Sequence, residues 1–387
     1  METRKLYYED SHTQAASSTV LSCQPVEKGW EVILDATVFY PEGGGQACDL
    51  GTLGDARVLD VQERDEAVVH LCDKPLAPGS RVDGCIDYTR RFRLMQQHSG
   101  EHIVSGIINR RYGYHNVGFH MGSQTMVIDF DGVVPAEDLP KIELAANRAV
   151  WANLPVRCWY PSPEELPNVR YRTKKALPWP VRIVEIPGTD ACACCGTHVK
   201  ATGEIGIIKL FTAVPCRGGT RIEMACGAHA YDLLNLAFAQ NRLVSQAFSA
   251  KWPETGAAAA RMNEALEAEK AAKNALWQRI FGGIANSYVN WGDVVHFEDG
   301  LDSVQVRELA DAIADTCGGI AAVFSGSDGS GYGFAMVIRQ GDIRPLGKEM
   351  TSALNGRGGG KPNFQQGRVN APKADIKNFF AEREIVV

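Results

Sequence analysis

The chain has 387 residues, of which 45% are hydrophobic and 22% are charged. This length and composition are typical of a soluble globular protein with two to four domains and ample core. The formal net charge of −6 excludes a global attraction to nucleic acid, so any RNA contact must come from local basic patches.

The sequence also indicates where the protein works. No apolar run reaches the roughly 18 residues of a membrane helix, and residues 1–10 lack the apolar block of a signal peptide. Eleven cysteines without a secretion signal favour a reducing cytoplasm. In that compartment a cluster of cysteines indicates metal binding or catalysis more often than disulfides. We therefore expect a cytoplasmic protein that does not enter a membrane.

Residues 1–88 are predicted to form a β-rich, barrel-like domain. Short apolar runs at 32–34 and 68–71, each bounded by turn residues, are typical of strands. Between them, residues 39–46 contain three consecutive glycines, which permit a sharp turn or a close approach of backbone to a ligand. Taken alone, this stretch is more simply interpreted as a surface turn.

Residues 89–229 are predicted to form an α+β domain around one long helix. From Phe92 to Arg111 the apolar residues recur at helical spacing and no proline interrupts them. His98 and His102 are four residues apart and therefore share one face of that helix. A second helix is predicted at 135–153, and strands are predicted at 124–131, 156–160 and 181–186.

The last third of the chain changes character twice. Residues 230–283 are rich in Ala, Leu, Glu, Lys and Gln and predict a helical linker, broken at Pro253 and Gly256 into a hairpin or a kinked arm. Residues 284–387 return to mixed α/β patterning. Strands are predicted there at 320–324 and 334–338, and glycine clusters at 355–362. The predicted fold class is α+β, with a C-terminal α/β domain.

The pattern that carries chemistry consists of two short chelating pairs, His98-x-x-x-His102 and Cys194-x-x-x-His198. A loop thiolate and a histidine four residues later can hold one ion if the chain turns at Gly196. Tetrahedral coordination by nitrogen and sulfur is what zinc prefers. We therefore predict a Zn²⁺ ion at these four residues.

Other ligand sets are open from the sequence. Cys226 and His229 form a second pair with shorter spacing, and Cys195 could replace Cys194. Cys192 could be a bystander or an exchangeable ligand. Four protein ligands are typical of a closed structural site, whereas a catalytic site keeps one position free. Either one ligand is displaced and water binds the metal, or the metal organises the pocket.

Together these motifs resemble the editing domain of alanyl-tRNA synthetase and its freestanding relatives, the AlaX proteins. The two ligand pairs carry the resemblance, as do the glycine motif at 40–46 and the block at 195–206. The glycine cluster at 356–364 is similar to the DHH-associated C-terminal domain of the synthetase. The resemblance covers nearly the whole chain and is closest to the long AlaX form, with no aminoacylation domain ahead of it.

This resemblance implies a trans-editing aminoacyl-tRNA hydrolase that needs zinc but no ATP. Its substrate would be tRNA(Ala) mischarged mainly with serine, and in some members with glycine; water attacks the ester that links the amino acid to the terminal ribose. The C-terminal domain would bind tRNA, form a homodimer, or both. Glu42 and Glu101 stand where many synthetases have threonine, and Cys195 replaces a glycine, which leaves the serine and glycine preference open.

The resemblance and the residue chemistry together give the candidate site residues. Glu101 is the carboxylate nearest the histidines and would act as a general base, or it is a solvated helix residue. Thr197 would donate its hydroxyl to the substrate, or it holds the turn. His120 aligns with a polar residue of the synthetase pocket. The remaining residues predicted to bind substrate are Glu42, Gly43, Gly44, Gly45, Gln46, Arg91, Arg93, Gly358, Gly359 and Lys361.

Two further observations concern RNA and the competing functions. A basic cluster surrounds Trp179, whose ring could stack on a base or lie in the core. The alternatives to an editing hydrolase are a zinc-stabilised RNA-binding module without turnover and an editing enzyme of the related threonyl class. The cluster around Trp179 consists of Arg170, Arg172, Lys174, Lys175 and Arg182.

Overall fold

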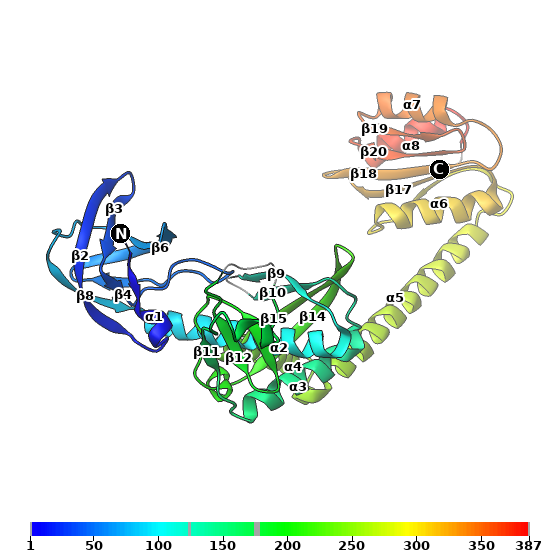
Figure 1. Cartoon of the computed structure of the whole chain (residues 1–387). Coiled ribbons are helices and arrows are strands. Elements are labelled where there is room, and N and C mark those ends of the chain that lie inside the picture. The colour runs from blue at the N-terminus through cyan, green and yellow to red at the C-terminus, as the bar shows by residue number, and fades with distance from the viewer. Residues whose placement is uncertain (1, 123–124, 174–178, 386–387) are drawn as a thin grey trace. The chain divides into compact units, whose positions relative to one another are not determined.

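The computed structural model, drawn in Figure 1, describes residues 2–122, 125–173 and 179–385. It forms two compact units, Met1–Leu243 and Val244–Val387, so the four-domain division stays a prediction. Both units combine helices with sheets, which confirms the predicted α+β class. Lys174, Lys175 and Gln124 lie outside the described residues. None of the described helices is long and apolar enough to cross a membrane.

The first unit begins with six antiparallel strands that close into a barrel, because the last of them pairs back onto the first. Side chains of alternate residues point into the barrel, and Val32, Leu53 and Val58 fill it. The strands predicted at 32–34 and 68–71 are confirmed. In barrel order the strands are β2 (Ala15–Val26), β3 (Gly29–Leu34), β7 (Ala67–Cys72), β6 (Ala56–Arg64), β5 (Gly51–Leu53) and β8 (Arg81–Ile86).

Helix α2 (Tyr88–Tyr112) follows the barrel and confirms the helix predicted for 92–111. The Asp87 side chain caps its start by accepting a hydrogen bond from the backbone N–H of Arg90, at 3.0 Å. Gly113 ends it in the left-handed conformation, with φ 76°. Most of the helix from Leu94 to Ile108 is buried, so the side chains of its central turns are enclosed by other elements.

Outside the barrel and α2, the main elements of the first unit are two sheets, the helix α3 and most of the helix α4 (Figure 1). The larger sheet has the order β14-β15-β10-β9 and the smaller has the order β11-β12-β13. The helix predicted at 135–153 and the strands predicted in this region are confirmed within a few residues. The elements are β9 (Asn116–Met121), β10 (Met126–Phe130), β14 (Ile208–Cys216), β15 (Gly219–Cys226), β11 (Arg157–Trp159), β12 (Ile183–Ile186), β13 (Asp190–Ala193), α3 (Leu139–Trp151) and α4 (Gly227–Ala247), with a short parallel pair of β1 (Arg4–Lys5) and β4 (Ala36–Thr37), a turn of helix α1 (Leu6–Glu9), and 3₁₀ turns at Ala136–Asp138, Leu166–Asn168 and Thr202–Ile205.

The second unit contains a five-stranded sheet of order β16-β17-β18-β20-β19. The strands predicted at 320–324 and 334–338 are confirmed in β17 and β18. The glycine cluster is itself an edge strand, β19, whose residues are all exposed. The elements are a 3₁₀ turn at Trp252–Glu254, α5 (Thr255–Asn286), β16 (Gly292–Phe297), α6 (Ser303–Cys317), β17 (Gly318–Ser327), β18 (Gly331–Val337), α7 (Arg344–Ala353), β19 (Arg357–Lys361), β20 (Phe364–Val369) and α8 (Lys373–Ala381).

His70 is a fully buried histidine of the barrel. Its Nδ1 donates to the Val32 carbonyl at 3.1 Å, and its Nε2 accepts from the Thr37 hydroxyl at 2.8 Å. The imidazole is therefore held in its neutral form. Burial lowers the pKa of His70 from its ordinary 6.5 to about 4, and the hydrogen bond to Val32 only partly opposes this.

We predict that this histidine makes the first unit sensitive to acid. Below pH 6.5 the His70 side chain takes up a proton in the unfolded chain but not in the folded one. The free energy of unfolding is therefore not reduced by this residue above pH 6.5, and it decreases as the pH falls towards 4. The loss from this residue amounts to at most about 3 kcal/mol. Urea unfolding of metal-free protein between pH 7.5 and 4.5 should show a shallower pH dependence for His70→Gln than for the wild type. Equal slopes would contradict the prediction.

Candidate metal centre

The four predicted ligands meet at one point in the first unit. Helix α2 places His98 and His102 one turn apart, and the segment after β13 brings Cys194 and His198 against them. One ligand atom of each residue lies within 4.8 Å of those of the other three. The distance from Cys194 Sγ to His98 Nε2 is 3.4 Å. All three imidazoles are at most 2% exposed, so the cluster is buried.

The ring of His98 is oriented by a chain of fixed hydrogen bonds. The backbone N–H of Thr197 donates to Gln46 Oε1 at 3.1 Å, which fixes the orientation of the Gln46 amide. The same oxygen lies 2.9 Å from His98 Nδ1 and can only accept. Nδ1 of His98 therefore carries the proton, and Nε2 is left as a lone-pair ligand directed at Cys194.

The other two histidines are oriented at the same ring position. His102 Nδ1 donates to Asp190 Oδ2 at 3.1 Å, and that carboxylate is fixed by two hydrogen bonds of 2.7 Å from Arg172. His198 Nδ1 lies 3.3 Å from the Ser99 hydroxyl. In each case Nε2 is the nitrogen left for the centre of the cluster. Such partners set the tautomer of a metal-binding histidine.

The donor set fits a metal ion. His198 Nε2 is buried and has no hydrogen-bond partner in the described part of the chain, although a buried polar atom ordinarily has one. Burial would raise the pKa of the Cys194 thiol, but the hydrogen bonds of the imidazoles hold that pKa well below 9.0. Burial lowers the pKa of His198. A thiolate and a neutral imidazole are the metal-binding forms.

The alternative ligands are not part of this cluster. The group around the histidines contains Cys194, and neither Cys195, Cys226 nor His229 belongs to it. Cys195 is exposed. Cys192 lies instead with His102 and Asp190 in an adjoining group, where Arg172 already pairs with the carboxylate. The set predicted from the spacing is therefore the set that the structure brings together.

Two features hold the loop that supplies Cys194. Arg182 donates from Nη1 to the carbonyl oxygens of Cys194 and Gly196, at 2.9 and 3.0 Å. A Cβ on Gly196 would overlap the ring of His98, so only glycine lets the backbone pass so close to the ligand. The loop conformation thus depends on a buried arginine and on one glycine.

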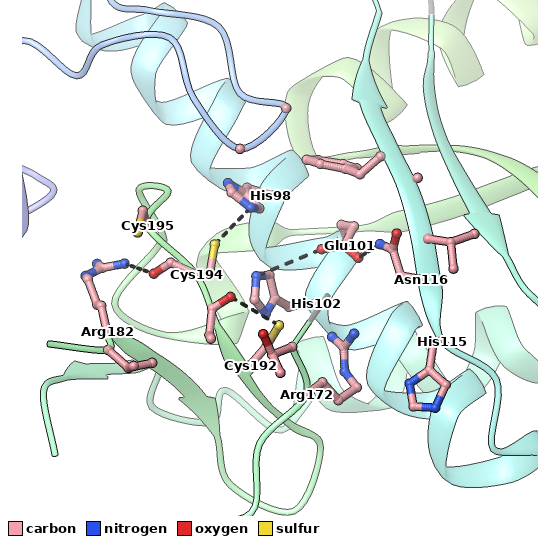
Figure 2. A pocket seen from close by; sticks show the side chains of 18 of the residues that line it. His98, Glu101, His102, His115, Asn116, Arg172, Arg182, Cys192, Cys194 and Cys195 are labelled. Carbon is pink, nitrogen blue, oxygen red and sulfur yellow. Dashed lines mark hydrogen bonds and ion pairs between the residues drawn. The ribbon is translucent and has the colours of Figure 1, made fainter. Parts of the chain in front are cut away.

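A cavity of about 740 Å³ opens beside the cluster. Figure 2 shows Glu101 and Asn116 on one side of His102, and Arg182 with the cysteine loop on the other. Glu101 is the only carboxylate that lines this cavity among the described residues. Gly44 and Gly45 also line it, and a Cβ on Gly45 would come within 2.6 Å of the Phe119 ring. Phe119 in turn stacks on His98, with ring centroids 5.3 Å apart.

Several predicted substrate contacts do not reach the cavity. Thr197 is fully buried, and its hydroxyl accepts a hydrogen bond from Gln46 Nε2 at 2.8 Å. Both residues therefore belong to the hydrogen-bond network that orients His98. His120 is exposed and does not line the cavity. Glu42 and Gly43 also lie outside its lining, and Glu42 accepts from Gln62 Nε2 at 3.2 Å.

The two arginines ahead of the histidines are already paired. Arg91 is fully buried in an ion pair with Asp49 and also donates to the Val38 carbonyl, at 2.7 Å. This placement corrects its prediction as a substrate contact, because the guanidinium does not face solvent. Arg93 is exposed and lies 3.1 Å from Asp232. Gly358, Gly359 and Lys361 lie on the exposed strand β19 of the second unit.

Asp190 and Asn116 were not predicted from the sequence, and Arg172 was assigned to a basic RNA-binding cluster, whereas the structure pairs Arg172 with Asp190. Asp190 and Arg172 orient His102, and Asn116 holds Glu101 with a hydrogen bond of 2.6 Å. Asp190 comes 88 residues after His102, and no local pattern links the two. Asn116 begins a short strand.

Two stretches of the chain match families of known proteins. Residues 181–229, which include Cys194 and His198, match the family described as Threonyl and Alanyl tRNA synthetase second additional domain. Residues 2–90 match the family described as tRNA synthetases class II (A). The chain therefore falls in the class of proteins that share domains with these synthetases.

Relatives that match nearly the whole chain show more closely which proteins it is similar to. The chain is 28% identical to the alanyl-tRNA editing protein Aarsd1 of Mus musculus, over 94% of this chain and 93% of that one. It is 32% identical to the alanine–tRNA ligase of Thermofilum pendens over 96% of this chain, and it spans 43% of the length of that ligase. The C-Ala domain of Aquifex aeolicus alanyl-tRNA synthetase covers 24% of this chain and 93% of its own, at 21% identity and a TM-score of 0.21, which is too low to define the fold. The chain is thus similar over nearly its whole length to proteins named as alanyl-tRNA editing proteins, which is the resemblance that its motifs predicted.

We predict that the metal content depends on the cluster and not on the neighbouring thiol. Cys194→Ala and His102→Ala should each reduce bound metal from about one ion per chain to nearly none, because each removes one of four ligands. Cys195→Ser is the matched control, since Cys195 is adjacent but exposed. Mass spectrometry of total metal in purified protein measures the ratio. Full metal content in Cys194→Ala, or its loss in Cys195→Ser, would contradict the assignment.

Proposed function

We propose that this protein is a hydrolase that deacylates tRNA(Ala) mischarged with serine, and secondarily with glycine, in a Zn²⁺-dependent site. The observation that carries the proposal is the cavity that opens directly beside the buried cluster of three histidines and one cysteine. The similarity to a protein named as an alanyl-tRNA editing protein over 94% of this chain supports the substrate class. An aminoacyl ester is small enough for a cavity of this size.

Zinc is the proposed ion because the donor set contains three nitrogens and one sulfur. When bound, zinc polarises oxygen atoms of groups that approach it. Four protein side chains satisfy its usual tetrahedral coordination, so we infer that the ion first of all fixes the cavity wall. The chain's own residues on that wall then bind and orient the ester.

The cavity wall carries both negatively and positively charged side chains. Glu101 supplies a carboxylate, and Arg172 and Arg182 line the wall on the side of the cysteine loop. We propose that Glu101 contacts the aminoacyl group, while Gly44 and Gly45 let backbone lie against it. Thr197 and Gln46 act through His98, which they orient. His120 has no proposed role in the reaction.

Selectivity for serine over alanine follows from hydrogen bonding. A site built to bond a hydroxyl rejects the analogue without it by as much as about 10⁴–10⁵-fold, because its polar groups would stay unpaired. Exclusion by size cannot spare alanyl-tRNA, since alanine is smaller than serine. The proposed site therefore releases serine and leaves correctly charged tRNA intact.

The test of this proposal is the release of amino acid from charged tRNA. Purified protein should release serine from seryl-tRNA(Ala), release glycine more slowly, and leave alanyl-tRNA(Ala) unchanged. Radiolabelled amino acid in the acid-soluble fraction measures the rates. Binding without release would instead indicate an RNA-binding module, and release only from a tRNA of another identity would indicate the threonyl class.

The second unit is proposed to bind the body of the tRNA through strand β19. Gly358, Gly359 and Lys361 lie on this exposed edge beside Arg357, and phosphate contacts by basic side chains dominate nucleic-acid affinity. We also propose that this unit mediates homodimer formation, as the family resemblance implies.

We predict that Lys361→Ala weakens tRNA binding severalfold at low salt. One lost phosphate contact should make the dependence of log affinity on log salt shallower by about one. Lys270→Ala is the matched control, because Lys270 is an exposed lysine of the same unit that pairs with Glu267 on α5. Filter binding of tRNA between 50 and 200 mM salt, conditions of the order used for such slopes, measures both effects. An unchanged slope for Lys361→Ala would contradict the assignment of β19.

A further inference from the structure

Glu101 differs from every other buried acid of the described chain. Four carboxylates are buried: Asp49, Glu101, Asp138 and Asp190. The three aspartates each pair with an arginine, namely Arg91, Arg111 and Arg172. For Glu101 the described ion pairs include only His102, whose Nε2 lies 3.9 Å from Glu101 Oε2.

His102 cannot act as the lasting counter-charge of Glu101. Its Nε2 is the nitrogen directed at the metal centre, and a metal-bound imidazole is neutral. The thiolate of Cys194 offsets part of the charge of a bound ion. A buried carboxylate without a cation is costly, because buried charges are normally paired. Among the buried acids of the described chain, Glu101 is therefore the one that forms no ion pair with an arginine, although Arg172 lines the same cavity.

The contacts of Glu101 show which of its oxygens is available. Ser105 Oγ and Asn116 Nδ2 both donate to Oε1, at 2.5 and 2.6 Å. A carboxylate only accepts, so the Asn116 amide must present its nitrogen to it. The dashed line in Figure 2 joins Asn116 to Glu101 in this way. Oε2 receives neither of these hydrogen bonds, and the residue lines the cavity.

Ser105 and Asn116 hold the carboxylate of Glu101 from one side, so Oε2 is the oxygen left to meet a group in the cavity. Asn116 adds a second acceptor nearby, because its Oδ1 is buried without a hydrogen-bond partner in the described chain. This corner of the cavity is thus rich in acceptors.

We propose that Glu101, held by Ser105 and Asn116, binds the protonated α-amino group of the aminoacyl ester. A primary ammonium offers three donors and one positive charge, which match the acceptors Glu101 Oε2 and Asn116 Oδ1. The substrate class would then be esters of free amino acids, and esters without a protonated α-amino group would be poor substrates. This inference rests on the proposed deacylase function.

The experiment compares two esters of the same size. Seryl-tRNA(Ala) is treated with nitrous acid to replace the α-ammonium by a hydroxyl, and hydrolysis of both esters is measured for wild-type protein and Glu101→Gln. Rates are divided by the uncatalysed hydrolysis rate of each ester. Metal content is measured in both proteins, so that a lost ion is not mistaken for a lost contact. Glu137→Gln, which changes an exposed carboxylate of the same unit, is the matched control.

The expected result is a change in discrimination. Glu101→Gln should lower kcat/KM for the aminoacyl ester on the order of 10- to 100-fold, as befits a lost hydrogen bond to a charged group. The same substitution should alter hydrolysis of the hydroxyacyl ester less than about threefold, within the spread of additive, uncoupled changes. Glu137→Gln should behave as the wild type on both esters.

Two different failures can be told apart. If Glu101→Gln lowers both rates by the same factor, Glu101 acts on water or on the fold, and the ammonium subsite is wrong while the deacylase function stands. If the wild type does not discriminate between the esters, the subsite is wrong as well. If the wild type releases no serine at all, the proposed function fails, and the subsite fails with it.

Discussion

The orientation of three buried imidazoles is the constraint on which the site depends. Each ring uses Nδ1 for a hydrogen bond to a neighbouring residue and leaves Nε2 for the cluster. The partners Gln46, Asp190 and Ser99 come from the glycine turn, from β13 and from α2, so the three rings are oriented only where these parts of the chain meet.

The cavity follows from the same constraint. Residues that line it come from the glycine turn, α2, β9 and the segment around β13, and these elements are brought together around the cluster. Gly45 and Gly196 allow the close packing against Phe119 and His98. The proposed chemistry needs this proximity, because an ester in the cavity would lie next to the proposed metal ligands, Glu101 and two arginines at the same time.

Much of this arrangement could be predicted from sequence because it is encoded locally. The i, i+4 spacing of His98 and His102 fixes their relative position on a helix, and the same spacing relates Cys194 to His198. Burial and direction are not local properties. Arg91 was predicted to contact substrate but is buried against Asp49. Glu101, predicted as a general base or else as a solvated helix residue, is buried and held by Asn116. Thr197 likewise serves a histidine and not the cavity.

The central claim is that one metal ion is held by His98, His102, Cys194 and His198. X-ray absorption spectroscopy at the zinc edge of the purified, full-length protein tests it most directly. The account predicts a single zinc environment with one sulfur at about 2.3 Å and three nitrogens at about 2.0 Å. A spectrum with two or more sulfurs, or with no sulfur, would contradict it.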